Sequence, residues 1–161
     1  MKKIIILIVV AFSLTACGSS DSPQTTSSGN SKPKSMVPDR PVDDGKGIGE
    51  VKNVTLNDPL DPQMSQKGKA IYEMKCASCH KLTSQRVVGP GWEGITERRK
   101  PEWIMNMATN VEVMLEEDPA AQEMLKECLV RMPNQNLTIG DARDVLEFMF
   151  ENDSSIKASE K

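Results

Sequence analysis

The stretch Cys76-Ala77-Ser78-Cys79-His80 decides how this 161-residue chain folds. Cysteines three residues apart on a helical turn point the same way, so their two thiols can reach the same side of one ligand. A haem carries two vinyl groups on adjacent edges of one side, and a histidine directly after the second cysteine can offer a ring nitrogen to the iron. The spacing therefore predicts one haem c, bound covalently through Cys76 and Cys79, with His80 on the iron.

Three other interpretations of the cysteine pair compete with haem attachment. A thioredoxin-like dithiol is expected near strands that alternate with helices, and the sequence has no such run of Val/Ile-rich strands. A zinc site needs a second ligand pair, for which only the isolated Cys128 remains, and His80 is the one histidine of the chain. A plain disulfide is chemically possible in an oxidising compartment. Haem attachment is the prediction that the spacing favours.

The residues around the motif resemble those of class I cytochromes c. Gly68 and Tyr72 precede the first haem cysteine at four-residue steps, and Gly89-Pro90 follows nine to ten residues after the histidine. The resemblance covers about residues 63–152. It implies an all-α fold, the class I cytochrome c fold, with four to five helices around one covalently attached haem.

The resemblance also implies how the iron is held. The carbonyl oxygen of Pro90 would accept a hydrogen bond from the His80 ring nitrogen that does not bind iron, which fixes the tautomer and raises the basicity of the ring. Met132 is followed by Pro133, as in the loop that carries the distal methionine of the family, and is the expected sixth ligand. Four other methionines fall in helical patterns and are expected to fill the core: Met105, Met107, Met114 and Met124.

Helical patterns predict four helices, at about residues 63–76, 101–109, 119–129 and 139–151. Asp118 is the expected N-cap of the third helix, and Thr138 and Asp141 form a near capping box at the start of the fourth. In the family the last helix crosses the first, so Gly68 and Tyr72 are expected to contact Phe148 or Met149. The chain is poor in aromatic residues (4%), and a haem would fill its interior.

Other notable residues are expected to have structural roles. Trp92 and Trp103 are predicted to be core residues rather than hydrogen-bond donors to a haem propionate. Arg98-Arg99-Lys100 is predicted to be a solvated turn before a helix rather than a docking patch. Cys128 is expected to be a small buried apolar residue.

The N-terminus is typical of an exported lipoprotein. Lys2 and Lys3 precede the apolar stretch 4–14, which is too short to span a bilayer, since spanning takes about 20 residues. The residues that end at Cys17 resemble the bacterial lipobox, which implies cleavage before Cys17 and its acylation. The chain is thus expected to consist of a signal peptide (1–16), a flexible tether (17–35), an extended arm or linker (36–62), the cytochrome c domain (63–152) and a polar tail (153–161).

These features together predict a function. The net charge of −3 argues against a nucleic-acid partner. Two axial ligands would leave the iron no open position, so we expect an electron carrier rather than an enzyme. It would pass electrons from a membrane quinol-oxidising complex or another cytochrome to a terminal reductase or oxidase. The lipid anchor would hold it in the bacterial cell envelope, on the outer membrane facing the periplasm.

Two alternatives from other classes remain open at the level of sequence. If Met132 does not bind the iron, an open iron site would suit small-gas binding or sensing, or peroxidase-like chemistry. If no haem is attached, the chain would be a thiol oxidoreductase or a structural lipoprotein.

Overall fold

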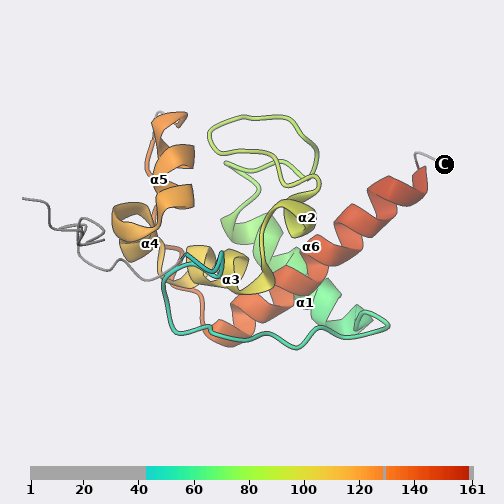
Figure 1. Ribbon diagram of the computed structural model, residues 1–161. Helices are drawn as coiled ribbons and strands as arrows, with labels where there is room; N and C mark the ends of the chain where they lie inside the picture. The colour runs from blue at the N-terminus through green and yellow to red at the C-terminus, as the bar shows by residue number, and fades with distance from the viewer. Residues whose placement is uncertain (1–42, 129, 160–161) are drawn as a thin grey trace, which may run out of the picture. The chain divides into compact units, whose positions relative to one another are not determined.

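The computed structural model describes residues 43–128 and 130–159, and every regular element in this part is a helix (Figure 1). The six helices are α1 (Pro62–Lys75), α2 (Ile95–Arg98), α3 (Pro101–Thr109), α4 (Val111–Glu117), α5 (Pro119–Lys126) and α6 (Ile139–Ser159). The predicted all-α class is confirmed. The short helices α2 and α4 were not predicted. None of these described helices is long and apolar enough to cross a membrane.

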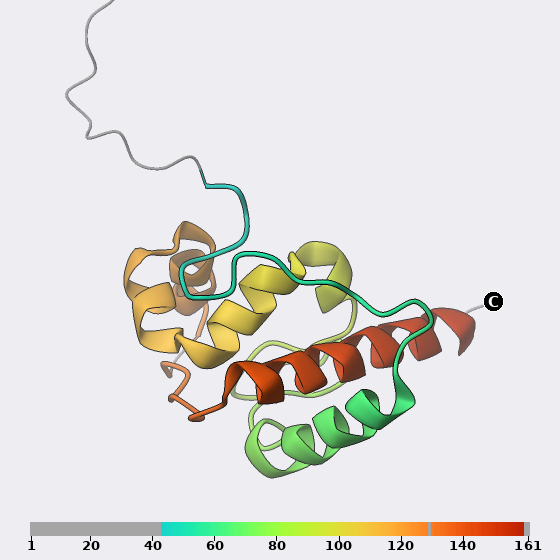
Figure 2. The same cartoon turned by 90° about the horizontal axis from the view of Figure 1, so that it is seen from below.

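Helices α1 and α6 cross at close range, as Figure 2 shows. A Cβ at Gly68 would overlap the backbone oxygen of Asp144 and lie 2.9 Å from the Cβ of Phe148. One turn further on, the rings of Tyr72 and Phe148 lie 5.6 Å apart between centroids. The predicted contact of Gly68 and Tyr72 with Phe148 is confirmed, and it depends on the missing side chain of the glycine.

The helix ends follow the predicted caps. The carboxylate of Asp118 accepts a hydrogen bond of 2.8 Å from the N–H of Ala121, which confirms it as the N-cap of α5. Asp141 accepts from both the N–H and the hydroxyl of Thr138, and the Thr138 hydroxyl oxygen accepts from the N–H of Asp141 in return. This is the reciprocal arrangement of a capping box. Helix α5 ends at Lys126, three residues earlier than predicted.

The predicted polar tail at 153–161 is wrong for residues 153–159, because α6 continues to Ser159. Asp153 is only 4% exposed in this extension. Its carboxylate accepts hydrogen bonds from the N–H of Gly94 and from the N–H and hydroxyl of Thr96. Partners nearly sixty residues away in the sequence therefore stabilise a helical extension whose own residues are mostly polar.

Residues 43–61 form an extended arm that packs against α3, and Figure 2 shows it running beside α3 and α6. The side chain of Asn106, fully buried in α3, fastens it. Its carbonyl oxygen accepts from the N–H of Val51, and its amide donates to the backbone oxygens of Lys46 and Val51. The sequence left open whether residues 36–62 are a linker or an arm. Residues 36–42 lie outside the described residues, as does the predicted lipidation site Cys17.

The far end of the arm is held by a buried carboxylate of α6. Glu147 accepts hydrogen bonds from Asn57 at 3.0 Å and from the N–H of Asp61 at 2.7 Å, and it pairs with Arg143 at 2.5 Å. Burial alone would raise the pKa of Glu147. The hydrogen bonds from Asp61, Arg143 and Asn57 outweigh burial, so the pKa lies below its ordinary value and the buried group stays ionised.

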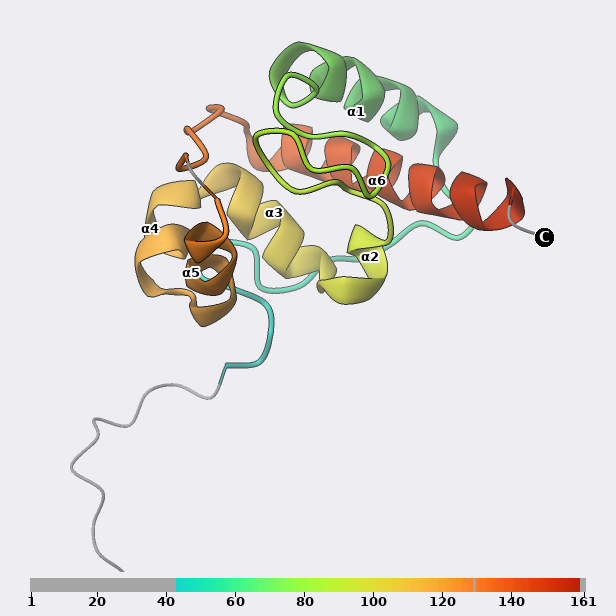
Figure 3. The same ribbon diagram turned by 90° about the horizontal axis from the view of Figure 1, so that it is seen from above.

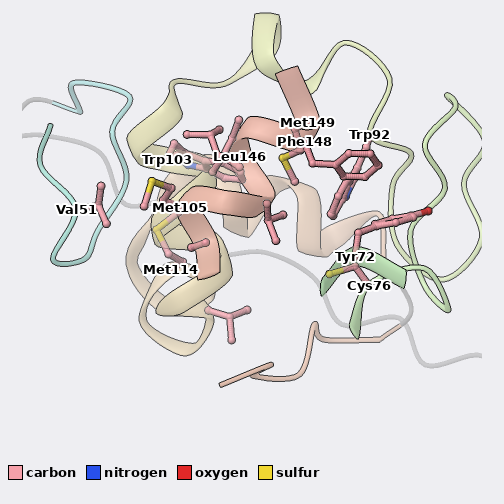
Figure 4. Packing of buried hydrophobic residues seen from close by; sticks show 14 of the residues in the cluster. Val51, Tyr72, Cys76, Trp92, Trp103, Met105, Met114, Leu146, Phe148 and Met149 are labelled. Carbon is pink, nitrogen blue, oxygen red and sulfur yellow. The ribbon is translucent and has the colours of Figure 1, made fainter. Parts of the chain in front are cut away.

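The apolar core lies around α6, and Figure 4 shows its two ends. Tyr72, Trp92 and Phe148 gather at one end, while Trp103, Met105 and Met114 gather at the other. Both tryptophans are buried as predicted, and the indole N–H of Trp103 donates to Asp118. Met105 and Met114 fill the core as predicted, whereas Met107 and Met124 are half-buried.

Candidate haem site

A cavity of about 590 Å³ opens between α1, the segment that follows it, α3, α5 and the loop before α6. Its volume falls in the usual range for small-molecule sites, about 300–1,000 Å³. The structure brings all five haem-site residues predicted from the sequence to this one cavity: Cys76, Cys79, His80, Pro90 and Met132.

The two cysteines lie where α1 ends and the chain tightens into a turn. Cys76 is the C-cap of α1, and its carbonyl oxygen accepts from the N–H groups of Cys79 and His80. The hydroxyl of Tyr72 donates to the backbone oxygen of His80 at 2.8 Å and fixes the end of this turn. Burial raises the pKa of the Cys76 thiol to about 11, which keeps it protonated near neutral pH.

The ring of His80 is held in one tautomer. Its Nδ1 lies 2.8 Å from the carbonyl oxygen of Pro90, and a carbonyl oxygen can only accept, so the proton is on Nδ1. The lone pair of the ring is therefore on Nε2. Burial lowers the pKa of His80 below its ordinary value, although the hydrogen bond to Pro90 acts in the opposite direction. The neutral form, the one that can bind a metal, is favoured.

The segment from Lys81 to Gly94 folds back over His80, and Figure 3 shows it lying between α1 and α2. The N–H of Gly89 donates to the Cys79 oxygen at 2.9 Å, and the N–H of Trp92 donates to the Lys81 oxygen at 2.8 Å. The Trp92 ring lies 5.7 Å from the His80 ring between centroids. These bonds hold the Pro90 carbonyl over the histidine.

The loop between α5 and α6 supplies another part of the cavity wall. Met132 is half-buried there and lines the cavity. The ammonium group of Lys75 donates to the backbone oxygen of Gln135 at 3.0 Å and ties this loop to the end of α1. Three further methionines line the same cavity: Met107, Met124 and Met149. Met132 differs from them in lying on a loop rather than within a helix.

Arg86 and Cys128 also line the cavity, and neither was predicted to do so. The Arg86 guanidinium pairs with the Glu127 carboxylate at 2.9 Å and donates to the Cys128 sulfur at 3.4 Å. Cys128 is half-buried, so the prediction of a buried residue is wrong. Helix α5 ends two residues before it, so Cys128 lies outside the helix.

Basic side chains gather around the cavity. Arg98 and Arg99 line it; Arg98 is exposed, as predicted for a solvated turn, whereas Arg99 is half-buried, so the prediction is wrong for Arg99. The guanidinium of Arg99 lies 4.8 Å from the centre of the Trp103 ring. Lys100 instead donates to the backbone oxygen of Asp44 in the arm. Folding brings Arg86 and Arg98 to one cavity, and no pattern in the sequence connects the two residues.

The described residues fit a haem c. Two thiols and an unprotonated ring nitrogen belong to one mostly apolar cavity of suitable size. A haem also carries two propionates, and cationic side chains around such a cavity can neutralise carboxylates. The basic residues that line it are Lys75, Arg86, Arg98, Arg99 and Arg131.

Comparisons with known proteins agree with this fit. The family model for cytochrome c matches residues 65–152. A cytochrome c-553-like protein of Synechocystis sp. is 29% identical over 76 residues, which cover 40% of this chain and 72% of that protein. The solved cytochrome c of Rhodothermus marinus superposes with a TM-score of 0.64 and 30% identity, covering 66% of this chain and 91% of that chain. An engineered form of that cytochrome, bound to a carbene intermediate, gives a TM-score of 0.61 at 30% identity, with the same coverage. The chain therefore belongs to the cytochrome c family and carries a covalently attached haem c.

Proposed function

We propose that this protein is a one-electron carrier whose haem is bound through Cys76 and Cys79, with His80 and Met132 as axial ligands. The hydrogen bond between His80 Nδ1 and the Pro90 carbonyl oxygen is the observation that carries the proposal. It leaves Nε2 as the one ring nitrogen with a lone pair for the iron, and a partner on Nδ1 is the usual companion of a metal-bound histidine.

Family membership indicates electron transfer in general, and the proposed ligands favour it over catalysis. The haem supplies a one-electron Fe(III)/Fe(II) couple when bound. With His80 and Met132 both bound, the iron would have no position for a substrate, and the thioether would raise the reduction potential. The cavity is lined mostly by apolar surface.

The surface by which electrons enter and leave is proposed to be the rim of the cavity. Val88 and Val130 line the cavity, and with their neighbour Val87 they are between 43% and 59% exposed. Arg86 and Arg131 lie beside these valines in the sequence and also line the cavity. An apolar centre with positive neighbours suits brief contact with a redox partner that carries acidic groups.

The cellular setting is proposed from the N-terminal sequence. A signal of residues 1–16, followed by acylation of Cys17, would tether the protein to the outer membrane, facing the periplasm. There it would take electrons from a quinol-oxidising complex or another cytochrome and deliver them to a terminal reductase or oxidase. Residues 17–35 are rich in Ser, with Thr, Gly and Pro among them, and would give the haem domain its range of movement.

The ligand assignment is tested with carbon monoxide. The ferrous wild-type protein is expected to bind CO slowly or not at all at neutral pH, whereas Met132→Ala binds it rapidly and has a lower reduction potential. Met124→Ala is the matched control, since Met124 lines the same cavity and should affect packing alone. A reversed pair of results would refute Met132 as the ligand. Rapid, stoichiometric CO binding by the wild type would instead favour a gas-binding or peroxidase-like function.

A further inference from the structure

The extension of α6 holds the segment that carries Pro90. The carboxylate of Asp153 accepts from the N–H of Gly94 at 2.9 Å, and from the N–H and hydroxyl of Thr96 at 3.1 and 2.7 Å. Asp153 is 4% exposed, and its carboxylate lies close enough to the Lys157 ammonium of the same helix for the two charges to interact. It lies one residue beyond the end of the family match, at residue 152.

The neighbouring residue holds the other end of the same segment. The side-chain amide of Asn152 donates to the backbone oxygen of Leu82 at 3.1 Å. Leu82 follows His80 by two residues, and Gly94 follows Pro90 by four. Two adjacent side chains of α6 thus fix both ends of the loop that turns the Pro90 carbonyl onto the imidazole.

Hydrogen bonds inside the loop connect these ends to Pro90. The N–H of Trp92 donates to the Lys81 oxygen, and the N–H of Ser84 donates to the Glu93 carboxylate at 2.7 Å. A Cβ at Gly91 would overlap the backbone oxygen of Thr83, so the two sides of the loop are in close contact. These contacts connect both ends of the loop to the peptide that carries the Pro90 carbonyl.

We propose that Asn152 and Asp153 are positioning residues for the axial histidine, an inference that rests on the proposed function. By fixing residues 82–96 they keep the Pro90 carbonyl on Nδ1 of His80. That hydrogen bond makes the ring a stronger electron donor and favours ferric iron. The two residues therefore lower the reduction potential without touching the haem iron or its ligands.

The proposal is tested on the haem-loaded protein with three variants that each remove some of the hydrogen bonds between α6 and the loop: Asp153→Asn, Asn152→Ala and Thr96→Val. All three are expected to raise the reduction potential, with the largest shift in Asp153→Asn, whose amide group would face N–H donors. Hydrogen exchange of the Nδ1–H of His80, followed by NMR, should become faster in all three variants, and fastest in Asp153→Asn. Ser155→Ala is the control, because Ser155 is an exposed residue of the same extension whose hydroxyl donates to the backbone oxygen of Glu151 in its own helix. It should leave the potential and the exchange rate unchanged.

Two outcomes would overturn the proposal. Unchanged potentials and exchange rates with a lower melting temperature would mean that the hydrogen bonds of Asn152 and Asp153 only stabilise the fold. A shift in Asp153→Asn alone would mean that the lost charge, and not the position of the loop, sets the potential. Failure of the proposed function looks different, since the wild type itself would then lack a histidine-bound iron.

Discussion

Gly89 lies against the imidazole ring of His80, so closely that a Cβ at this position would come within 2.7 Å of Nδ1. The same peptide segment places the carbonyl oxygen of Pro90 on that nitrogen. The backbone can reach the ring from this side because Gly89 has no side chain. Gly89 is thus required for steric reasons, and the Pro90 carbonyl is the group that bonds the histidine.

Gly89→Ala is therefore expected to displace the His80 ring and weaken its bond to iron. The measurement is the fraction of purified protein with a low-spin, histidine-ligated spectrum, which should fall well below that of the wild type. Gly140→Ala is the control, since a Cβ there would lie 3.7 Å from the nearest atom, the hydroxyl oxygen of Thr138. A normal spectrum for Gly89→Ala would show that the loop can retreat from the ring at little cost.

Gly68→Ala is expected to destabilise the crossing of α1 and α6. The new Cβ would overlap the backbone oxygen of Asp144, which cannot move without shifting the whole helix. Overpacking of this kind costs about 1–3 kcal/mol. Denaturant unfolding of the haem-loaded protein measures it, and Gly140→Ala should stay within about 0.5 kcal/mol of the wild type. A loss below 1 kcal/mol for Gly68→Ala would contradict such a tight crossing.

Local sequence signals predicted the parts of the fold that local chemistry determines. The heme-binding motif sets its own turn, Pro101 and Pro119 start helices at the expected places, and Asp118 and Thr138 cap theirs. The spacing of the motif and of the Gly-Pro pair also identified the residues that meet at the cavity. Each of these signals lies within a few residues of the structure it determines.

The parts that were missed depend on distant partners. The short helices α2 and α4 have four and seven residues, too few to form without tertiary contacts. The extension of α6 looks like a polar tail until Gly94 and Thr96 supply donors for Asp153. The arm looks like a linker until Asn106 and Glu147 bind it. Sequence patterns within a window of ten residues contain none of these partners.

Glu147 is expected to make the stability of the protein depend on acid pH. Its pKa in the folded protein lies below the ordinary value of 4.5, so near that pH the unfolded chain binds more protons than the folded one. The stabilisation is fully present above pH 4.5 and is lost as the pH falls through the lowered pKa. The free energy of unfolding of the wild type, minus that of Glu147→Gln, should therefore decline below pH 4.5.

Urea unfolding at intervals from pH 7 to pH 3 measures this difference. Glu112→Gln, a change of an exposed glutamate in α4, is the control and should follow the wild-type profile. A difference between wild type and Glu147→Gln that stays constant over the whole range would show that the hydrogen bonds to the arm do not depend on the charge.

The haem is expected to be necessary for folding, because without it the mostly apolar cavity of about 590 Å³ would be open to water. Apolar surface left exposed to water is unfavourable, and a typical domain has a total stability of only about 5–15 kcal/mol to offset it. The double variant Cys76→Ala/Cys79→Ala, which cannot retain the haem covalently, should have little helical signal in far-UV circular dichroism.

Cys128→Ala is the control for the double variant. It removes a thiol that lines the same cavity but leaves both attachment points in place, so its helical signal should equal that of the wild type. Native-like helicity and a sharp thermal transition in the double variant would mean that the chain closes the cavity by itself. The packing of α1 against α6, and the binding of the arm by Asn106 and Glu147, would then be sufficient to hold the fold.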